Sequence, residues 1–323
     1  MDRRVFTLGA LAASLGVQSA SYAREQDWPR SRVTIIVPFP AGAATDITGR
    51  IVAAKLSQIW GQPVVIDNRG GGNGISASEA AARAKPDGLT LFLTSAMTQV
   101  VNPALYEKLP YDPIRDFEPI TRFGRLPFVV LVPETSPIKT LDQLTALLKK
   151  EPGKHNFGAG SLPARVASEM YKKLTGVDVV SIAYKSNPQA FPDLFSGLLT
   201  FMIIDVVNAK LQISSGKMRG LAVSLAQREE QLPEIPSAPE AGLPGFELIT
   251  WTGFYAPRGT PETLVNKINR DIVAACRDPG VLQSFASLGG PPKTTTPEEF
   301  KQFASSEMQK WGDIIRQSQI KLD

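Results

Sequence analysis

The fold is decided by the stretch Val33-Thr34-Ile35-Ile36-Val37-Pro38-Phe39-Pro40-Ala41-Gly42-Ala43-Ala44-Thr45-Asp46. Its first five residues, rich in β-branched side chains, predict a buried strand. The two prolines end that strand, because neither can donate a hydrogen bond to a neighbouring strand. Small residues follow, and Thr45 or Asp46 can cap a helix that we expect to reach Trp60. A strand, a turn of small residues and a helix start direct free backbone N–H groups towards an anion, although ordinary connections in α/β proteins share this pattern.

Residues 1–23 have the pattern of an export signal. Asp2-Arg3-Arg4 precedes an apolar run from Leu8 to Val17, and Ser21-Tyr22-Ala23 offers a cleavage site after Ala23. The apolar run is too short for a stable membrane span. The paired arginines fit the twin-arginine route and the general secretory route, and either one predicts a periplasmic protein.

The composition indicates a globular protein that binds no nucleic acid. The formal net charge of +4 over 323 residues is small, and the charges are interspersed. The single cysteine, Cys276, cannot form an internal disulfide, and its helical pattern of apolar neighbours favours buried packing. A chain of this length is expected to form two domains.

Strand-like and helix-like segments alternate along the chain. Before Asp112, their order predicts a mostly parallel sheet with helices on both faces. Beyond it, residues 117–123 and 128–133 form two extended segments, and we expect the second to cross into another α/β unit. Two crossings predict a clamshell, with a ligand cleft at the carboxyl ends of the strands. We expect residues 29–125 together with 251–323 to form domain 1 and residues 126–250 to form domain 2, each a mixed, mostly parallel sheet flanked by helices.

A series of short motifs occurs in a characteristic order along residues 29–323. They are Pro38-Phe39-Pro40-Ala41-Gly42 with Thr45-Asp46, Asn68-Arg69 before Gly70–Gly74, Lys85-Pro86-Asp87-Gly88, Asn102-Pro103-Ala104-Leu105-Tyr106, Trp251-Thr252-Gly253 and Thr296-Pro297-Glu298-Glu299-Phe300. With these motifs the chain resembles the solute-binding receptors of tripartite tricarboxylate transporters, also called Bordetella uptake gene (Bug) receptors. Each motif is weakly specific alone, whereas the ordered series is highly specific.

The resemblance implies a type II periplasmic binding fold that captures a small organic molecule, usually a carboxylate. It also implies that backbone groups and bridging waters at the first strand–helix loop help to hold the ligand's carboxyl group. We therefore expect a monomeric receptor, not an enzyme, without a cofactor or metal. It would close over its ligand by a hinge motion and then dock on membrane permease subunits.

The candidate ligand-binding residues lie in loops that follow predicted strands. We expect main-chain N–H contacts at residues 42–45, and an opposing small-residue loop at residues 158–161 in the second unit. Asp46 either binds an amine of the ligand or only caps the helix. The full set is Phe39, Gly42, Ala43, Ala44, Thr45, Asp46, Ser95, Thr98, Gly158, Ser161, Ser186, Asn187 and Asp205.

Several departures from the family pattern bear on the identity of the ligand. Ala43 replaces a second glycine, and Ser186-Asn187 replaces a glycine after Tyr184-Lys185. Asp205 lies one residue beyond the position that often carries an aspartate, and Arg165 replaces a histidine. If Arg165 faces the cleft, a ligand with a second anionic group is favoured.

The alternative classes are a periplasmic enzyme and a sensor that docks on a signalling partner. The only histidine, His155, lies in a turn, and no Gly-x-Ser-x-Gly elbow is present. One histidine and one cysteine cannot build the usual zinc site. The Gly70–Gly74 loop lacks the Lys-Ser/Thr of a nucleotide-binding P-loop, and we interpret it as a cleft-rim loop. A sensor would use the same cleft as a transport receptor.

Overall fold

The computed structural model describes residues 28–286, 288 and 291–318, so the expected signal peptide lies outside the described residues. Strands and helices alternate as predicted. The strands are β1 (Val33–Val37), β2 (Val64–Asn68), β3 (Thr90–Ser95), β4 (Phe117–Pro133), β5 (Asn156–Ala159), β6 (Val180–Ala183), β7 (Phe201–Asp205), β8 (Met218–Val223) and β9 (Ile249–Pro257). The helices are α2 (Ala44–Trp60), η1 (Gly72–Gly74), α3 (Ile75–Ala82), η2 (Met97–Val101), α4 (Asn102–Leu105), α5 (Leu141–Lys150), α6 (Leu162–Thr175), α7 (Asn187–Phe195), α8 (Val206–Ser214), α9 (Glu262–Cys276), α10 (Pro279–Ala286) and α11 (Pro297–Ser318).

The described strands form one mixed sheet in the order β2-β1-β3-β9-β4-β7-β5-β6, with β8 also paired to β4. Strand β1 is parallel to β2 and β3, and β5 is parallel to β6 and β7. Strands β4 and β9 run antiparallel to their neighbours. We call the half with β1–β3 the first lobe and the half with β5–β8 the second lobe. This arrangement is the mixed α/β architecture that the alternation predicts.

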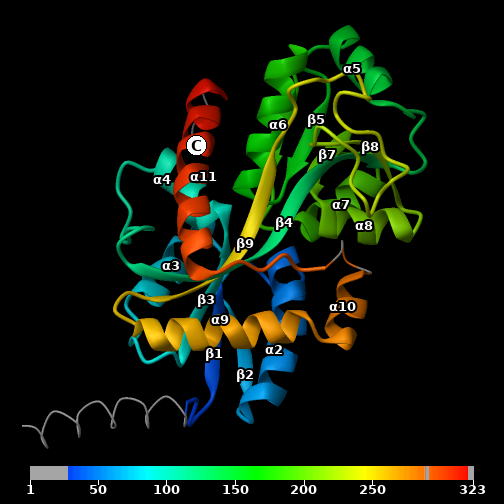
Figure 1. Ribbon diagram of the computed structural model, residues 1–323. Helices are drawn as coiled ribbons and strands as arrows, with labels where there is room; N and C mark the ends of the chain where they lie inside the picture. The colour runs from blue at the N-terminus through cyan, green and yellow to red at the C-terminus, as the bar shows by residue number, and fades with distance from the viewer. Residues whose placement is uncertain (1–27, 287, 289–290, 319–323) are drawn as a thin grey trace, which may run out of the picture.

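Strands β4 and β9 connect the lobes, passing side by side from one to the other (Figure 1). Strand β4 pairs with β9 over Phe117–Pro127 and with β7 and β8 over Phe128–Pro133. The expectation of two separate extended segments is wrong here, because β4 is continuous. The pairing of β4 with β9 shifts in register between Arg122 and Gly124, so the strand continues past the glycine. Pro127, which cannot donate a hydrogen bond, lies where β4 changes partners.

Hydrophobic clusters fix the helices on the sheet. Val33, Ile35 and Val37 of β1 pack with α2 and α9 on one face. On the other face, α3 and α11 pack on a cluster that continues along β4 into the second lobe. The C-terminal helices return to the first lobe as expected, but α11 also contacts α6 of the second lobe. At 22 residues, α11 is on the order of 33 Å long, enough to reach both lobes.

No helix in the described part of the chain combines the length and the apolar character that a membrane crossing requires.

Candidate functional site

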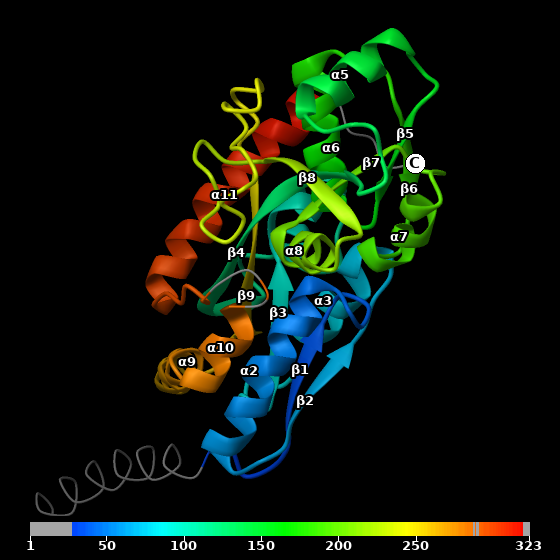
Figure 2. The same cartoon turned by 90° about the vertical axis from the view of Figure 1, so that its right-hand side faces the viewer.

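The N-termini of four helices meet at one cavity between the lobes. The N-cap residues of α2, α6, α7 and α8 are Ala43, Ser161, Ser186 and Asp205, and all of them line a cavity of about 60 Å³. Figure 2 shows α2 of the first lobe below α7 and α8 of the second lobe. Each of these helices follows a parallel strand, so the cavity lies at the carboxyl ends of both parallel strand sets. Helix N-termini carry unpaired N–H groups and the positive end of the helix dipole, and their convergence favours an anion.

Helix α2 offers the cavity two backbone amides that have no acceptor among the described residues, those of Ala44 and Thr45. The prediction of free amides is wrong for the two residues before them. The Gly42 N–H donates to the Asp46 carboxylate over 2.9 Å, and the Ala43 N–H donates to the Pro40 carbonyl over 3.2 Å. Gly42 has a φ of 84°, a conformation suited to glycine, which turns its amide back towards the helix.

Asp46 stabilises the turn before α2 through hydrogen bonds and does not line the cavity. Its carboxylate accepts hydrogen bonds from the Gly42 N–H and from Asn68 Nδ2, each over 2.9 Å, and pairs with Arg50 at 2.9 Å. Burial acts to raise the pKa of Asp46, but the bonds from Arg50, Gly42 and Asn68 outweigh it and hold that pKa below its usual value. Of the two roles considered, the structure shows the structural one, in the manner of a capping box.

The second lobe contributes a polar cluster around Asp205. Its carboxylate accepts from Asn187 Nδ2 over 3.2 Å, and from the Asn208 backbone N–H and Nδ2, each over 3.0 Å. Burial raises the pKa of Asp205 despite these bonds. Because neighbouring donors already occupy both carboxylate oxygens, Asp205 acts here as a helix cap. Lys185 lines the same cavity from an exposed position and adds a positive charge.

Two buried polar atoms at the cavity have no hydrogen-bond partner within the described residues. They are Asn187 Oδ1 and Thr250 Oγ1, and both residues line the cavity. An unsatisfied buried polar group costs about 1–3 kcal/mol, so such atoms indicate a site that a polar ligand or water completes. Thr250 lies in β9 and was not among the predicted residues. Its place directly before the Trp251-Thr252-Gly253 motif is the sequence signal that could have found it.

The cavity brings together most of the predicted residues. It leaves out Gly42, Asp46, Thr98 and Gly158, and also Arg165. Thr98 is buried and hydrogen-bonds Thr94 over 2.7 Å, and a Cβ at Gly158 would meet Leu199 and Tyr184, so both positions serve packing. The predicted residues that line it are Phe39, Ala43, Ala44, Thr45, Ser95, Ser161, Ser186, Asn187 and Asp205. Further lining residues are Pro40, Leu126, Phe128, Gly160, Pro163, Lys185, Pro188, Asn208 and Thr250.

The Gly70–Gly74 loop, expected at the cleft rim, does not line this cavity. It lies against the turn before α2, because a Cβ at Gly70 would meet Pro40 at 2.9 Å and one at Gly74 would meet Pro38 at 2.8 Å. The loop therefore supports the turn through close backbone packing.

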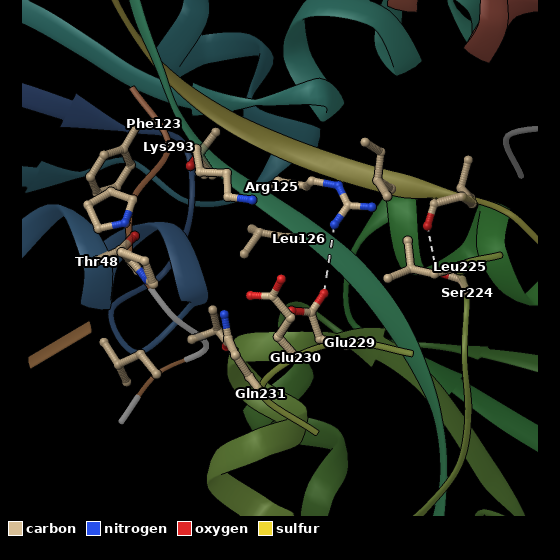
Figure 3. Close-up of a pocket in the computed structure, with 18 of the residues that line it drawn as sticks. Thr48, Phe123, Arg125, Leu126, Ser224, Leu225, Glu229, Glu230, Gln231 and Lys293 are labelled. Atoms are coloured by element: carbon tan, nitrogen blue, oxygen red, sulfur yellow. Dashed lines mark hydrogen bonds and ion pairs between the residues drawn. The ribbon is translucent and has the colours of Figure 1, made fainter. Parts of the chain in front are cut away.

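A larger cavity of about 440 Å³ lies beside the first, with Leu126 in the lining of both. Figure 3 shows Arg125 of β4 facing Glu229, with Glu230 and Lys293 nearby. The distance from Arg125 Nη1 to Glu229 Oε2 is 3.8 Å, and burial raises the pKa of Glu229 although Arg125 opposes that shift. Three carboxylates, Glu229, Glu230 and Glu247, line this cavity together with four cations, whereas the smaller cavity presents the N-termini of four helices. We therefore assign the candidate site to the cavity at the four helix N-termini.

The residues considered for other chemistry serve packing. His155 contacts Thr200 through Nδ1 at 3.1 Å and Glu151 through Nε2 at 3.3 Å. Cys276 is buried, as predicted, and burial raises the pKa of its thiol to about 12. A thiol of that pKa remains protonated at neutral pH and is a poor nucleophile.

A cavity between two α/β lobes joined by two strands defines the class of the periplasmic binding proteins. Residues 48–320 match the sequence model of a family described as tripartite tricarboxylate transporter family receptor. The chain belongs to this family. The resemblance and the fold class predicted from the sequence are thereby confirmed.

Relatives of known name or structure cover almost the whole chain. The protein BugT of Bordetella pertussis is 31% identical over 325 residues, covering 100% of this chain and 99% of BugT. Rpa4515 from R. palustris, solved with adipate, has a TM-score of 0.87 and 30% identity, covering 91% of this chain and 99% of that one. MatC (Rpa3494) from Rhodopseudomonas palustris, solved with bound malate, has a TM-score of 0.81 and 30% identity, covering 89% and 100%.

Proposed function

We propose that the protein is a periplasmic receptor that captures a small carboxylate between its lobes and delivers it to the membrane permease of a tripartite tricarboxylate transporter. The observation that carries this proposal is the free pair of amides at Ala44 and Thr45, within a cavity lined by four helix N-termini. The adipate and malate in the relatives' structures support a carboxylate as the ligand class. In this proposal the protein is a monomeric receptor rather than an enzyme, and residues 1–23 direct its export.

The capture step would be closure of the lobes about β4 and β9. Residues 29–125 with 251–323 would move against residues 126–250. A water-sized group needs about 10–15 Å³, so a cavity of about 60 Å³ holds a carboxylate with few further atoms. A larger ligand would enter with the lobes further apart and then stabilise the closed form through contacts to both.

Replacing Ala44 with proline tests the backbone contact directly. Ala44 is the first residue of α2, where proline is favoured; the substitution replaces the N–H with a ring carbon and breaks no hydrogen bond within the helix. Ala43, with φ −68° and ψ 155°, already has the conformation preferred before proline. Because a hydrogen bond to a charged group contributes about 1.5–3 kcal/mol, we expect carboxylate affinity to fall at least about tenfold. Isothermal titration with the tightest-binding member of a dicarboxylate panel, including adipate and malate, measures this.

The matched control is Glu262→Pro. Glu262 is the exposed first residue of α9, and it lines neither the candidate site nor the larger cavity beside it. The N-cap residue of α9, Pro261, has φ −53° and ψ 134°, a conformation that also suits a following proline. Affinity should stay within twofold of the wild-type value in this variant. If a folded Ala44→Pro protein binds the carboxylate as tightly as the wild type does, the Ala44 amide does not contact the ligand.

A further inference from the structure

A third cavity, of about 220 Å³, lies between α11 and the sheet of the first lobe. Phe117 of β4, Tyr255 of β9 and Met308 of α11 form apolar walls, and Gln99 of η2 adds a polar group. None of its lining residues belongs to either of the cavities described above. It is therefore a separate cavity from the candidate carboxylate site.

The hydroxyl of Tyr255 is buried at this cavity without a hydrogen-bond partner in the described residues. The side chain is 3% exposed, and its ring is held by Phe117 and Phe300, with centroids 6.1 and 4.9 Å away. Burial raises the pKa of Tyr255 well above its usual value, so the hydroxyl keeps its proton and can donate. A rigidly held donor that lacks an acceptor indicates a place for a polar atom, which a ligand or water supplies.

The mouth of the cavity is positively charged. Arg258 and Lys301 are exposed there, and neither has an ion-pair partner within the residues that the structure describes. Arg115 also lines the cavity but is paired with Asp112 at 2.7 Å. The one lining carboxylate, Glu118, accepts a hydrogen bond from the Gly259 N–H over 3.2 Å. Arg258 and Lys301 are thus the lining cations without a carboxylate partner.

We propose that this cavity is a second ligand site, for an aromatic carboxylate with an oxygen substituent at the far end of the ring. The walls would hold the ring, Arg258 and Lys301 would pair with the carboxylate, and Tyr255 would hydrogen-bond the distal oxygen. An engineered apolar cavity of about 150 Å³ binds benzene, so 220 Å³ accommodates a substituted ring. This site is additional to the carboxylate site between the lobes and does not depend on it.

The pair of probes 4-hydroxybenzoate and benzoate tests the proposal by titration followed by ligand-observed NMR. We expect the wild type to bind 4-hydroxybenzoate at least fivefold more tightly than benzoate. Tyr255→Phe should remove this preference, leave benzoate binding unchanged and retain the fold, because it deletes only an unpartnered hydroxyl. The double variant Arg258→Gln, Lys301→Gln should weaken both probes at least fivefold.

Three further variants locate the bound probe. Lys310→Gln removes an exposed lysine of the same helix that does not line this cavity, and Ala44→Pro alters the site between the lobes; neither should change probe binding. Ala304→Leu fills the cavity and should abolish binding of both probes. The proposal is overturned if the wild type binds neither probe at millimolar concentration. It is equally overturned if the preference survives Tyr255→Phe, or if only Ala44→Pro weakens binding.

Discussion

Gly160→Ala is expected to abolish carboxylate binding and to destabilise the protein. A Cβ at residue 160 would lie 2.1 Å from the Asn187 backbone N and 2.2 Å from the Ser186 carbonyl carbon. Backbone atoms cannot move aside as the end of a flexible side chain can, so the start of α7 must shift. Overpacking of this kind costs about 1–3 kcal/mol, and the shift displaces Ser186 and Asn187 from the cavity. Titration calorimetry and thermal unfolding measure the two effects.

The control for this substitution is Gly312→Ala in the interior of α11. There, the nearest atom to a new Cβ is the Arg316 guanidinium at 3.2 Å, at the end of a flexible side chain. Alanine in a helix interior is more stable than glycine by roughly 0.5–1 kcal/mol. We expect unchanged ligand affinity and equal or higher thermal stability. Wild-type affinity in Gly160→Ala would show that residues 186–187 do not shape the site.

Asp46→Asn is expected to lower the free energy of unfolding by about 1–3 kcal/mol at pH 7 and to weaken carboxylate binding. The asparagine side chain loses the charge that pairs with Arg50 and one of its two acceptor oxygens. Either the Gly42 N–H then lacks a partner, or Asn68 Nδ2 keeps only its hydrogen bond to the Phe39 carbonyl. Because these bonds fix the turn before α2, the amides of Ala44 and Thr45 lose their fixed direction. Chemical unfolding and ligand titration on the same preparation measure both effects.

The pH dependence of this loss follows from the direction of the pKa shift. The pKa of Asp46 is lower in the folded protein than its ordinary value of 3.8, so its stabilisation is complete above that value and disappears as pH falls through the folded pKa. The stability gap between wild type and Asp46→Asn should therefore be full at pH 7 and shrink below about pH 4. Asp313→Asn, which removes an exposed ion pair with Arg316, should cost no more than about 1 kcal/mol. A gap for Asp46→Asn that widens in acid would contradict the hydrogen-bond network described here.

The strand, turn and helix start that line the candidate cavity could be predicted from the sequence because they are local features. The bounds of β1 agree with the prediction, and α2 begins one residue before the expected Thr45. Whether each backbone amide of the turn is free or hydrogen-bonded could not be predicted from this local pattern. Whether the Gly42 N–H is free depends on the position of the Asp46 carboxylate, which Asn68 of β2 also holds. That position is a property of the packed sheet rather than of the turn.

Residues from distant segments were missed for a related reason. Thr250 reaches the cavity because β9 returns along β4, more than a hundred residues after that strand begins. The continuity of β4 also depends on partners, since β9 and then β7 supply the pairing across Gly124 and Pro127. A local pattern of glycine and proline predicts a break there, and long-range pairing overrides it.

A crystal structure with the tightest-binding dicarboxylate would show whether a carboxylate binds to the amides at the start of α2. The proposed function predicts carboxylate oxygens within about 2.7–3.2 Å of the Ala44 and Thr45 backbone nitrogens, with the ligand enclosed by both lobes. A ligand seated instead beside Arg125 and Glu229, with the Ala44 and Thr45 amides facing water, would contradict it.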